Sequence, residues 1–459
     1  MDFAPQQPKL GKFLISPPVR EEMAIQRNEM LRAINPVWKP IPVIITLNDS
    51  GDKLNEGLER AKTEVKRILE QQNISYRESE FYLFAALTPD QLDALAERRK
   101  WIHRIWMDET TYAHLLQSTE TIKATACWRT FQARGSGIVW AVMDTGISQN
   151  HPHFDGILRK DISYNFSNSL SDDDLNGHGS HVAGIISGAA KSKSDGSRWH
   201  AATYVEEQEE PAIIDLPDCI SGVAPLTQLV SIKVLDDNGT GTASNAILGL
   251  EYLRKLNRNS RSIVIDGVNM SLGYPFDPKW YSCGHSPLCE EVRRTVESGI
   301  IVVISCGNSG YGFSTLDDGT KTPIWLALSI SDPANTEDAI SVGSVHKCNP
   351  HTYGISYFSS KGPTGDGRHK PDLVAPGERV ISVSVKGGAN YEYEERSGTS
   401  MAAPHVSGAI SAFLSVHHEF RGSPKVVKEL FAKSATDLGR SVDFQGAGMI
   451  DLLRTIMSV

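Results

Sequence analysis

From residue 137 onwards, apolar runs of strand length alternate with segments whose apolar residues have helical spacing. Such alternation is typical of an α/β fold, in which a mostly parallel sheet carries helices on both faces. In that fold the carboxyl ends of the strands collect ligands and catalytic groups. The predicted strands are 137–143, 229–234, 262–270 and 300–305, and the predicted helices begin at 178 or span 243–256, 290–298 and 400–414.

Polar residues with useful chemistry lie at the ends of these elements. Asp144 directly follows the first strand, and His178 starts a helix between Gly177 and Gly179. Ser400 stands among small residues at the start of the last of these helices, where backbone N–H groups are unpaired. An acid, a base and a nucleophile in the order Asp, His, Ser form one of the three known chain orders of the serine-protease triad.

These segments resemble those of the subtilisin-like serine proteases, the subtilase family (peptidase family S8). The resemblance covers roughly residues 118–455. A metal pair at His178 and His181 is the alternative at one motif, but the flanking glycines favour close packing around a catalytic ring. Five further segments of the family occur in the family's order, at 221–225, 232–235, 269–273, 307–308 and 370–377.

The resemblance implies a serine endopeptidase that hydrolyses peptide bonds through an acyl-enzyme. It implies that His178 takes the proton of Ser400 and that Asp144 orients and stabilises the imidazole. Asn308 and the backbone N–H of Ser400 are the implied oxyanion hole, supported by Thr399. No cofactor is required for this chemistry. The alternative is a catalytically silent or partner-restricted processing or binding protein on the same fold.

The resemblance also implies that a polypeptide substrate binds as an extended strand between two backbone edges. Ser309 is uncharged, whereas some relatives carry an acidic residue nearby, so we predict a preference for apolar or aromatic P1 residues. The implied substrate-binding residues are Gly239, Thr240, Gly241, Ser271, Leu272, Gly273, Ser305, Cys306 and Gly307.

Calcium is where the sequence departs from the family. The family's strongest calcium site uses an acidic residue after a His-Pro pair and a short loop after the helix of the catalytic histidine. Here His153 follows the pair, and a surface insertion at 189–219 replaces the loop. We therefore predict that this site is absent. The acidic clusters at 172–174 and 236–237 offer oxygen ligands for Ca²⁺ elsewhere, although solvation is the simpler interpretation of both clusters and of the insertion.

The chain has six cysteines, too few for its length to indicate a disulfide framework. Reduced thiols are the favoured interpretation. A local disulfide between Cys283 and Cys289 is the second, and a zinc site that includes His285 is the third, because no second ligand pair has metal spacing.

Residues 41–116 have a different pattern and predict a small α+β domain. The pattern indicates strands at 43–47, 80–86 and 101–107 and helices at 54–70 and 88–99, with a final strand still to be placed. Thr88 and Gln91 have the spacing of a capping box. The preceding proline-rich residues 1–40 are expected to be a poorly ordered or surface-draped extension.

This small domain resembles the inhibitor-type propeptide of subtilases, which assists folding and then inhibits the active site with its C-terminal tail. The resemblance implies a self-processing zymogen whose tail is 112–116, with cleavage within four residues of Leu116. The catalytic domain is then 117–459. A permanent regulatory or docking domain is the alternative.

Charge and hydropathy exclude several partners. The net charge of −9 argues against nucleic acid, and no apolar run approaches the ~20 residues of a membrane-spanning helix. Residues 1–20 show no secretory signal, so we predict a cytoplasmic protein.

Overall fold

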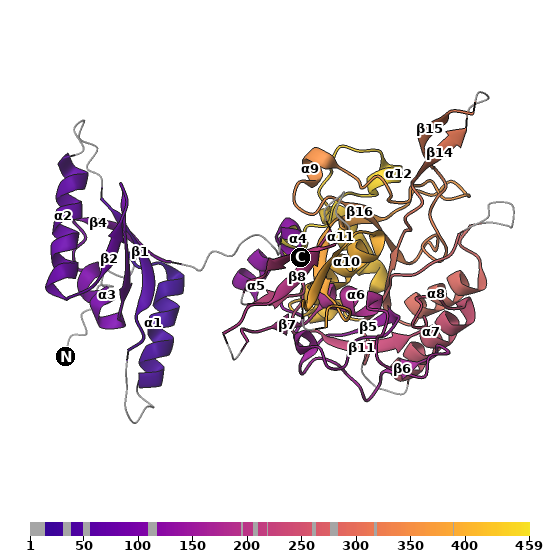
Figure 1. The fold of residues 1–459 in the computed structure, drawn as a ribbon, viewed down its shortest axis with the longest axis horizontal. Helices are drawn as coiled ribbons and strands as arrows, with labels where there is room; N and C mark the ends of the chain where they lie inside the picture. The colour runs from indigo at the N-terminus through magenta and orange to yellow at the C-terminus, as the bar shows by residue number, and fades with distance from the viewer. Residues whose placement is uncertain are drawn as a thin grey trace, which may run out of the picture. The chain divides into compact units, whose positions relative to one another are not determined.

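The computed structural model divides the chain into two compact units, Met1–Tyr112 and Ala113–Val459 (Figure 1). Each unit has its own hydrophobic core. The structure describes residues 14–30, 38–48, 56–108, 117–193, 196–204, 210–217, 219–258, 263–275, 283–315, 319–388 and 390–459.

The N-terminal unit is an antiparallel four-stranded sheet in the order β2-β3-β1-β4. Inward-facing side chains of its strands form one cluster with the apolar faces of its helices, so a single layer of helices covers one face of the sheet. Its elements are α1 (Pro17–Met30), β1 (Ile41–Leu47), α2 (Glu56–Gln71), β2 (Tyr76–Glu78), β3 (Tyr82–Leu87), α3 (Pro89–Ala96) and β4 (Ile102–Met107).

Two features of this unit differ from the sequence prediction. The missing strand is β2, which lies between α2 and β3 and not at the end of the domain. Within the segment predicted to be a poorly ordered extension, α1 packs into the core through Val19 and Met23, and Ile15 bridges to Ile105. The predicted tail at 112–116 lies outside the described residues.

The C-terminal unit is built on a seven-stranded sheet in the order β17-β16-β13-β12-β5-β11-β6, and every pair is parallel. The α/β prediction is confirmed. After β5 the chain forms β6 and β11 on one side of β5 and then β12 on the other side, so the order reverses at β5. The strands are β5 (Val139–Asp144), β6 (Tyr164–Asn165), β11 (Gln228–Lys233), β12 (Gly267–Met270), β13 (Ile301–Ser305), β16 (Ile340–Val345) and β17 (Leu373–Pro376).

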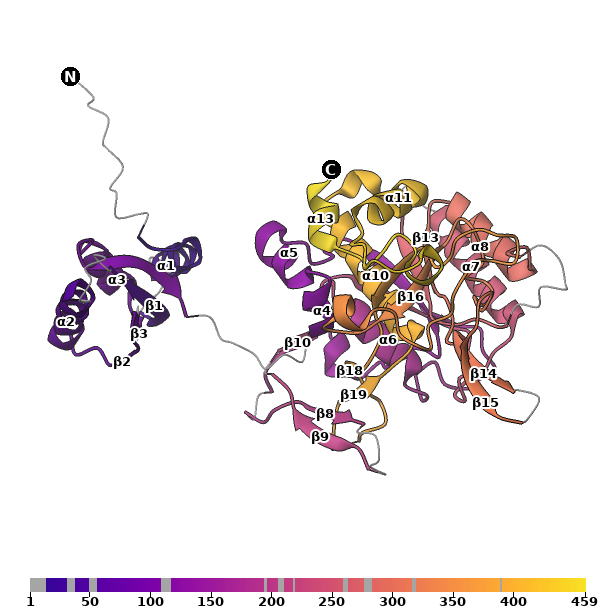
Figure 2. The ribbon, with the colours of Figure 1, turned by 90° about the horizontal axis from the view of Figure 1, so that it is seen from above.

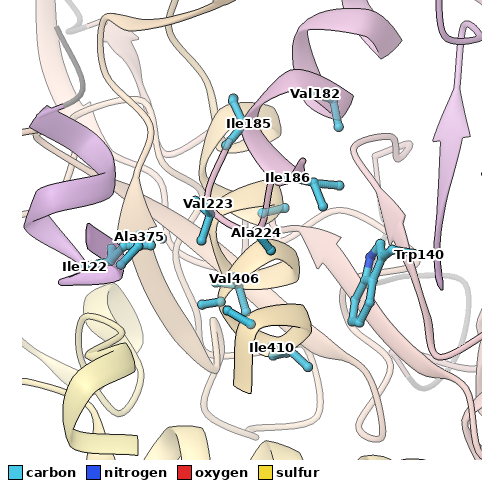
Figure 3. Packing of buried hydrophobic residues seen from close by; sticks show 14 of the residues in the cluster. Ile122, Trp140, Val182, Ile185, Ile186, Val223, Ala224, Ala375, Val406 and Ile410 are labelled. Carbon is cyan, nitrogen blue, oxygen red and sulfur yellow. The ribbon is translucent and has the colours of Figure 1, made fainter. Parts of the chain in front are cut away.

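Helices cover both faces of this sheet (Figure 1). Alternate residues of β5 illustrate the arrangement: Trp140 and Val142 face the core that contains α6 and α10, whereas Ala141 and Met143 face α7 and α8. Figure 3 shows the first of these cores, to which α6 contributes Val182 and Ile186 and α10 contributes Val406 and Ile410. The helices are α4 (Gln117–Thr121), α5 (Ala124–Phe131), α6 (His178–Ile186), α7 (Ala243–Arg258), α8 (Pro287–Glu297), α9 (Pro350–Tyr353), α10 (Thr399–Leu414), α11 (Pro424–Ser434), α12 (Val442–Gln445) and α13 (Leu452–Met457).

The C-terminal unit also contains smaller sheets outside the seven-stranded sheet (Figure 2). The prediction that insertion 189–219 is a solvated loop is wrong for residues 199–203 and 212–216, because β8 and β9 pair there and β8 joins β19, burying Trp199 and Ala201. The strands are β7 (Ala189–Ala190), β8 (His200–Thr203), β9 (Ala212–Asp215), β10 (Ile220–Ser221), β14 (Tyr311–Thr315), β15 (Lys321–Trp325), β18 (Val380–Val383) and β19 (Tyr393–Arg396).

Candidate active site

The carboxyl edge of the parallel sheet brings an aspartate and a histidine together. Asp144 is the last residue of β5 and is fully buried. Its Oδ1 lies 2.7 Å from Nδ1 of His178, the first residue of α6, and accepts the Thr145 N–H at 2.8 Å. This contact fixes Nδ1 as the protonated nitrogen of a neutral ring, which leaves Nε2 available as a base.

Glycines next to His178 allow its helix to approach β5. A Cβ atom on Gly179 would lie 2.1 Å from the Gly146 carbonyl oxygen and 3.1 Å from the Asp144 Cβ. Gly177 has a φ of +92°, which L side chains rarely adopt. Gly179 is therefore required by the close approach of the helix to β5, and Gly177 by its backbone conformation.

Asp174 organises the first turn of the same helix. Its carboxylate accepts hydrogen bonds from the N–H groups of Gly177 and Ser180, each at 2.8 Å, and from the Thr145 hydroxyl at 2.9 Å. A carboxylate at a helix N-terminus is favourably placed for both hydrogen bonding and the helix dipole. Asp174 therefore positions His178, a role that the sequence analysis missed because it grouped this residue with a solvated acidic cluster.

The environment of His178 raises its pKa above the ordinary value of 6.5. Burial of the ring lowers the pKa, but the charge of Asp144 and its hydrogen bond outweigh this effect. Arg396 opposes them, since its positive charge lowers the same pKa. Arg396 lines the cleft and pairs with Glu394, and the sequence analysis did not identify it.

Ser400 lies at the N-terminus of α10 and faces the same cleft. Its hydroxyl lies 3.4 Å from the Ser271 carbonyl oxygen, and the Ser271 hydroxyl donates to the Ser400 carbonyl at 3.0 Å. None of the hydrogen bonds between described residues uses the Ser400 N–H. That N–H is therefore available to a ligand in the cleft.

Thr399 fixes the orientation of the Asn308 side chain. The Asn308 Oδ1 accepts the Thr399 N–H at 2.9 Å and the Thr399 hydroxyl at 3.0 Å. The Thr399 hydroxyl also accepts the Gly307 N–H at 3.2 Å. Because its oxygen is held by Thr399, Asn308 turns its amide N–H₂ group away from Thr399.

A cleft of about 730 Å³ connects these residues to the predicted substrate edges. His178, Asn308 and Ser400 line it, and Asp144 lies behind His178. Leu328 and Arg396 line it without having been predicted. The predicted binding residues that line it are Gly239, Thr240, Gly241, Ser271, Leu272, Gly273, Ser305 and Gly307.

Cys306, which the sequence analysis grouped with these residues, does not line the cleft. Its side chain is fully buried, and its Sγ lies 3.5 Å from the Ser360 carbonyl oxygen. The alternation of side chains along β13 explains the difference, because consecutive residues point to opposite faces.

The residues at the family's strong calcium site do not fit a calcium ion. His153 is fully buried, its ring contacts the Tyr393 hydroxyl at 3.2 Å, and burial lowers its pKa to about 3. Elsewhere, Asp237 pairs with the buried Lys233 at 2.7 Å, and the Thr240 N–H donates to Asp236 at 2.9 Å. Across the described residues, no group of three or more histidine, cysteine or acidic side chains is placed to hold a metal.

All six cysteines are free thiols, including Cys283 and Cys289. Burial raises the pKa of Cys283 to about 11 and that of Cys289 to about 12, so both are unreactive at neutral pH. His285 contacts Glu290 at 3.3 Å. No helix in the described part of the chain is long and apolar enough to cross a bilayer.

Known proteins match the chain across this same fold and site. Residues 135–449 match the Subtilase family. The serine protease AprX of Bacillus subtilis (strain 168) is 30% identical over 385 residues, which cover 80% of this chain and 77% of that protein. An intracellular serine protease of Paenibacillus polymyxa is 32% identical over 358 residues, which cover 76% and 89%. The chain therefore belongs to the subtilase family and is a subtilisin-like serine endopeptidase.

Proposed function

We propose that Asp144, His178 and Ser400 form the triad of this endopeptidase. The observation that carries the proposal is the 2.7 Å contact between Asp144 and His178 at the cleft that Ser400 also lines. No hydrogen bond joins His178 to the Ser400 hydroxyl, which lies 3.4 Å from the Ser271 carbonyl oxygen. Catalytic hydrogen bonds are often long or poorly aligned in free enzymes and tighten when substrate binds.

In the proposed reaction, the Ser400 Oγ attacks the peptide carbonyl carbon while His178 Nε2 accepts the hydroxyl proton. The tetrahedral intermediate collapses, the C–N bond breaks, and the leaving amine takes the proton from Nε2. A water molecule then attacks the acyl-enzyme by the same route and releases the carboxylic acid. Asp144 stabilises the imidazolium that forms twice in this cycle.

Asn308 and the Ser400 N–H would stabilise the oxyanion. The Ser400 N–H makes no hydrogen bond to a described residue, and Thr399 holds the Asn308 amide in one orientation. Donors fixed before the reaction need no reorganisation when charge develops, and the loss of one such donor typically lowers kcat by about 10²–10³.

The proposed substrate is an extended polypeptide with an apolar or aromatic P1 residue. The rim residue Ser309 is uncharged, and Leu328 contributes an apolar wall to the cleft. In peptides that differ only at P1, we expect Phe and Leu to give a higher kcat/KM than Lys or Asp. Efficient cleavage after Lys alone would contradict this preference.

The N-terminal unit would act as an inhibitory propeptide of a self-processing zymogen, with cleavage near Leu116. Its position before the catalytic unit and its α+β fold support this role. The relative from Paenibacillus polymyxa is named an intracellular serine protease, which supports action inside the cell.

We also propose that the enzyme does not depend on calcium at the position of His153. A buried imidazole with a lowered pKa replaces the carboxylate that such a site needs. Removing calcium from a strong site would cost several kcal/mol of binding free energy and lower the melting temperature markedly. Because this site does not fit calcium, excess EDTA should shift the melting temperature by less than about 2 °C. A much larger decrease would contradict the proposal.

Intact mass spectrometry of the wild type and Ser400→Ala, each incubated with a fluorophosphonate probe, tests the function. Cleavage near Leu116 and a probe adduct in the wild type, both absent from the variant, would support a self-processing serine protease. An adduct without cleavage would support the triad and contradict self-processing. If neither occurs, even after limited proteolysis of the N-terminal unit, the triad assignment is wrong.

A further inference from the structure

Lys361 is a buried cation that the proposed mechanism does not use. Its side chain is 2% exposed, and its Nζ donates to the carbonyl oxygens of Ser359 at 2.7 Å and of Gly310 and Tyr357 at 3.1 Å each. No ion pair between described residues involves it. Burying a charge without an opposite charge is costly, so this placement calls for a role.

Two aromatic rings complete the surroundings of the ammonium group. Nζ lies 4.7 Å from the ring centroid of Trp325 and 5.2 Å from that of Phe444, within the range of cation–π attraction. Trp325 is the last residue of β15, and Phe444 lies in α12. The ammonium therefore joins the β14–β15 hairpin, seen projecting in Figure 1, to the body of the unit.

Lys361 also contacts both ends of that hairpin. Gly310, whose carbonyl accepts from Nζ, immediately precedes β14 and follows Asn308 by two residues. On the other side, the Lys361 N–H donates to the Ser329 hydroxyl at 2.9 Å, and the Ser329 N–H donates to the Lys361 carbonyl at 3.0 Å. Ser329 lines the cleft.

Residues just before Lys361 bind the backbone on either side of Asn308. The Ser360 N–H donates to the Gly307 carbonyl at 2.9 Å, and the Ser309 N–H donates to the Ser360 hydroxyl at 3.0 Å. The Gly310 N–H donates to the Phe358 carbonyl at 2.9 Å. Thr399 holds the side-chain oxygen of Asn308 and the N–H of Gly307, and segment 357–361 holds the backbone on both sides of Asn308 through these three bonds.

We propose that Lys361 is a positioning residue for Asn308: its ammonium group clamps segment 357–361 and the root of the β14–β15 hairpin together, and so fixes the oxyanion donor. The inference rests on the proposed role of Asn308. Only the ammonium can hold the carbonyls of Gly310, Tyr357 and Ser359 at one point, because it offers three donors and no acceptor.

A double-mutant cycle between Lys361→Met and Asn308→Ala tests the coupling. Methionine keeps the backbone bonds to Ser329 and most of the side-chain volume but removes the three donors. In the wild-type background we expect Lys361→Met to lower kcat about tenfold with KM changed less than twofold, because oxyanion stabilisation acts on the transition state. In the Asn308→Ala background the same change should lower kcat less than twofold.

Lys370→Met is the matched control. Lys370 is also 2% exposed and has a carbonyl acceptor, Ala339, but it pairs with Asp372. Its substitution should lower kcat equally with and without Asn308. If Lys361→Met does not fold, Trp325→Leu replaces it, since Trp325 is 58% exposed. Trp325→Leu should lower kcat in the wild-type background and change it less than twofold in the Asn308→Ala background.

The outcomes separate the two proposals. Equal losses of kcat from Lys361→Met in both backgrounds, or no loss in either, would overturn the positioning role while leaving Asn308 as the oxyanion donor. An unchanged kcat in Asn308→Ala itself would overturn the oxyanion assignment and, with it, the role of Lys361.

Discussion

The two units cover their central strands to different degrees. In β1 of the N-terminal unit, Ile41, Val43, Ile45 and Leu47 are buried, while the residues between them are exposed or half-buried. In β5 of the C-terminal unit all six residues are buried. The first sheet thus has one covered face and the second has two. The doubly covered sheet presents the candidate site at its carboxyl edge, on strands that packing holds from both sides.

The test with the largest expected effect concerns catalysis, which we assign to the C-terminal unit alone. Asp144→Asn should lower kcat about 10⁴-fold, because the amide no longer stabilises the imidazolium or the required tautomer. The pKa of His178 should fall in the same variant, since Asp144 raises it. The pH dependence of kcat/KM on a peptide substrate measures both effects.

Asp93→Asn provides the control in the N-terminal unit. Asp93 is exposed and pairs with Arg27 at 2.5 Å, and surface pairs of this kind contribute little to stability. We expect kcat to change less than twofold. A loss comparable to that of Asp144→Asn would mean that the chemistry is not confined to one unit.

The second test asks whether the core of the N-terminal unit can be disrupted without destabilising the C-terminal unit. Leu83→Ala removes a fully buried side chain from β3 and should destabilise the N-terminal unit by about 3 kcal/mol. Hydrogen-exchange mass spectrometry should then show about 10²-fold faster exchange in β1 and β3, with the strands of the parallel sheet unchanged.

Leu250→Ala is the matched change in the C-terminal unit, since Leu250 is also fully buried, between α7 and the sheet. It should accelerate exchange there and leave β1 and β3 unaffected. Parallel loss of protection in both units from either variant would show that they unfold cooperatively.

The sequence predicted the regular parts of both units for clear reasons. The apolar run of β13, which ends at Ser305, and the capping box at Thr88 are local residue patterns that predict their structure. By contrast, β2 has only three residues, and none of its pattern distinguishes it from a loop. Helix α1 packs through Val19 and Met23 into a core to which β4 and α3 belong. Because these elements are distant in sequence, the local pattern of α1 did not predict that it is ordered.

The site was predictable where its chemistry depends on motifs, and less so where it depends on tertiary placement. Asp144, His178, Asn308 and Ser400 each stand in a recognisable segment at an element's end. Arg396 lines the cleft from the end of β19, where it pairs with Val380 of β18, and no local sequence pattern indicates this pairing. Side-chain direction was also missed at Cys306, where the strand end was predicted correctly but the face was not.

The third test uses alkaline pH, to which only the C-terminal unit should respond through buried thiols. All cysteines follow residue 126. Burial raises the pKa of Cys127, Cys289 and Cys306 to about 12 and that of Cys283 to about 11. The unfolded chain releases these protons near pH 9 and the folded chain retains them, so the stability that they contribute declines as pH rises from 9 towards 12.

Buried lysines oppose this decline. Burial lowers the pKa of Lys361 and of Lys370 to about 8, so between pH 8 and 10.5 the unfolded chain binds more protons at these groups and stability rises. With four thiols against two lysines, we expect a net decrease on the order of 1 kcal/mol per pH unit above pH 9. Urea unfolding at pH 8, 9 and 10 measures it, and Cys306→Ala should reduce the slope. If the free energy of unfolding declined equally with pH in both units, the buried thiols of the C-terminal unit would not be the cause.

The smallest expected effect concerns how helices begin in the two units. At α3 the Gln91 N–H donates to the Thr88 hydroxyl, and the Thr88 N–H donates to the Gln91 side chain at 2.9 Å. At α10 no side chain of the preceding residue caps the helix, and the Ser400 N–H remains available for substrate. Thr88→Ala should therefore destabilise the N-terminal unit by about 1 kcal/mol without changing kcat, whereas Thr88→Ser should retain most of the stability. Chemical denaturation monitored by hydrogen exchange in α3 measures the difference in stability between the two variants. Equal stability of the Ala and Ser variants would mean that the capping box contributes nothing, and that the helix ends of the two units differ in geometry but not in energy.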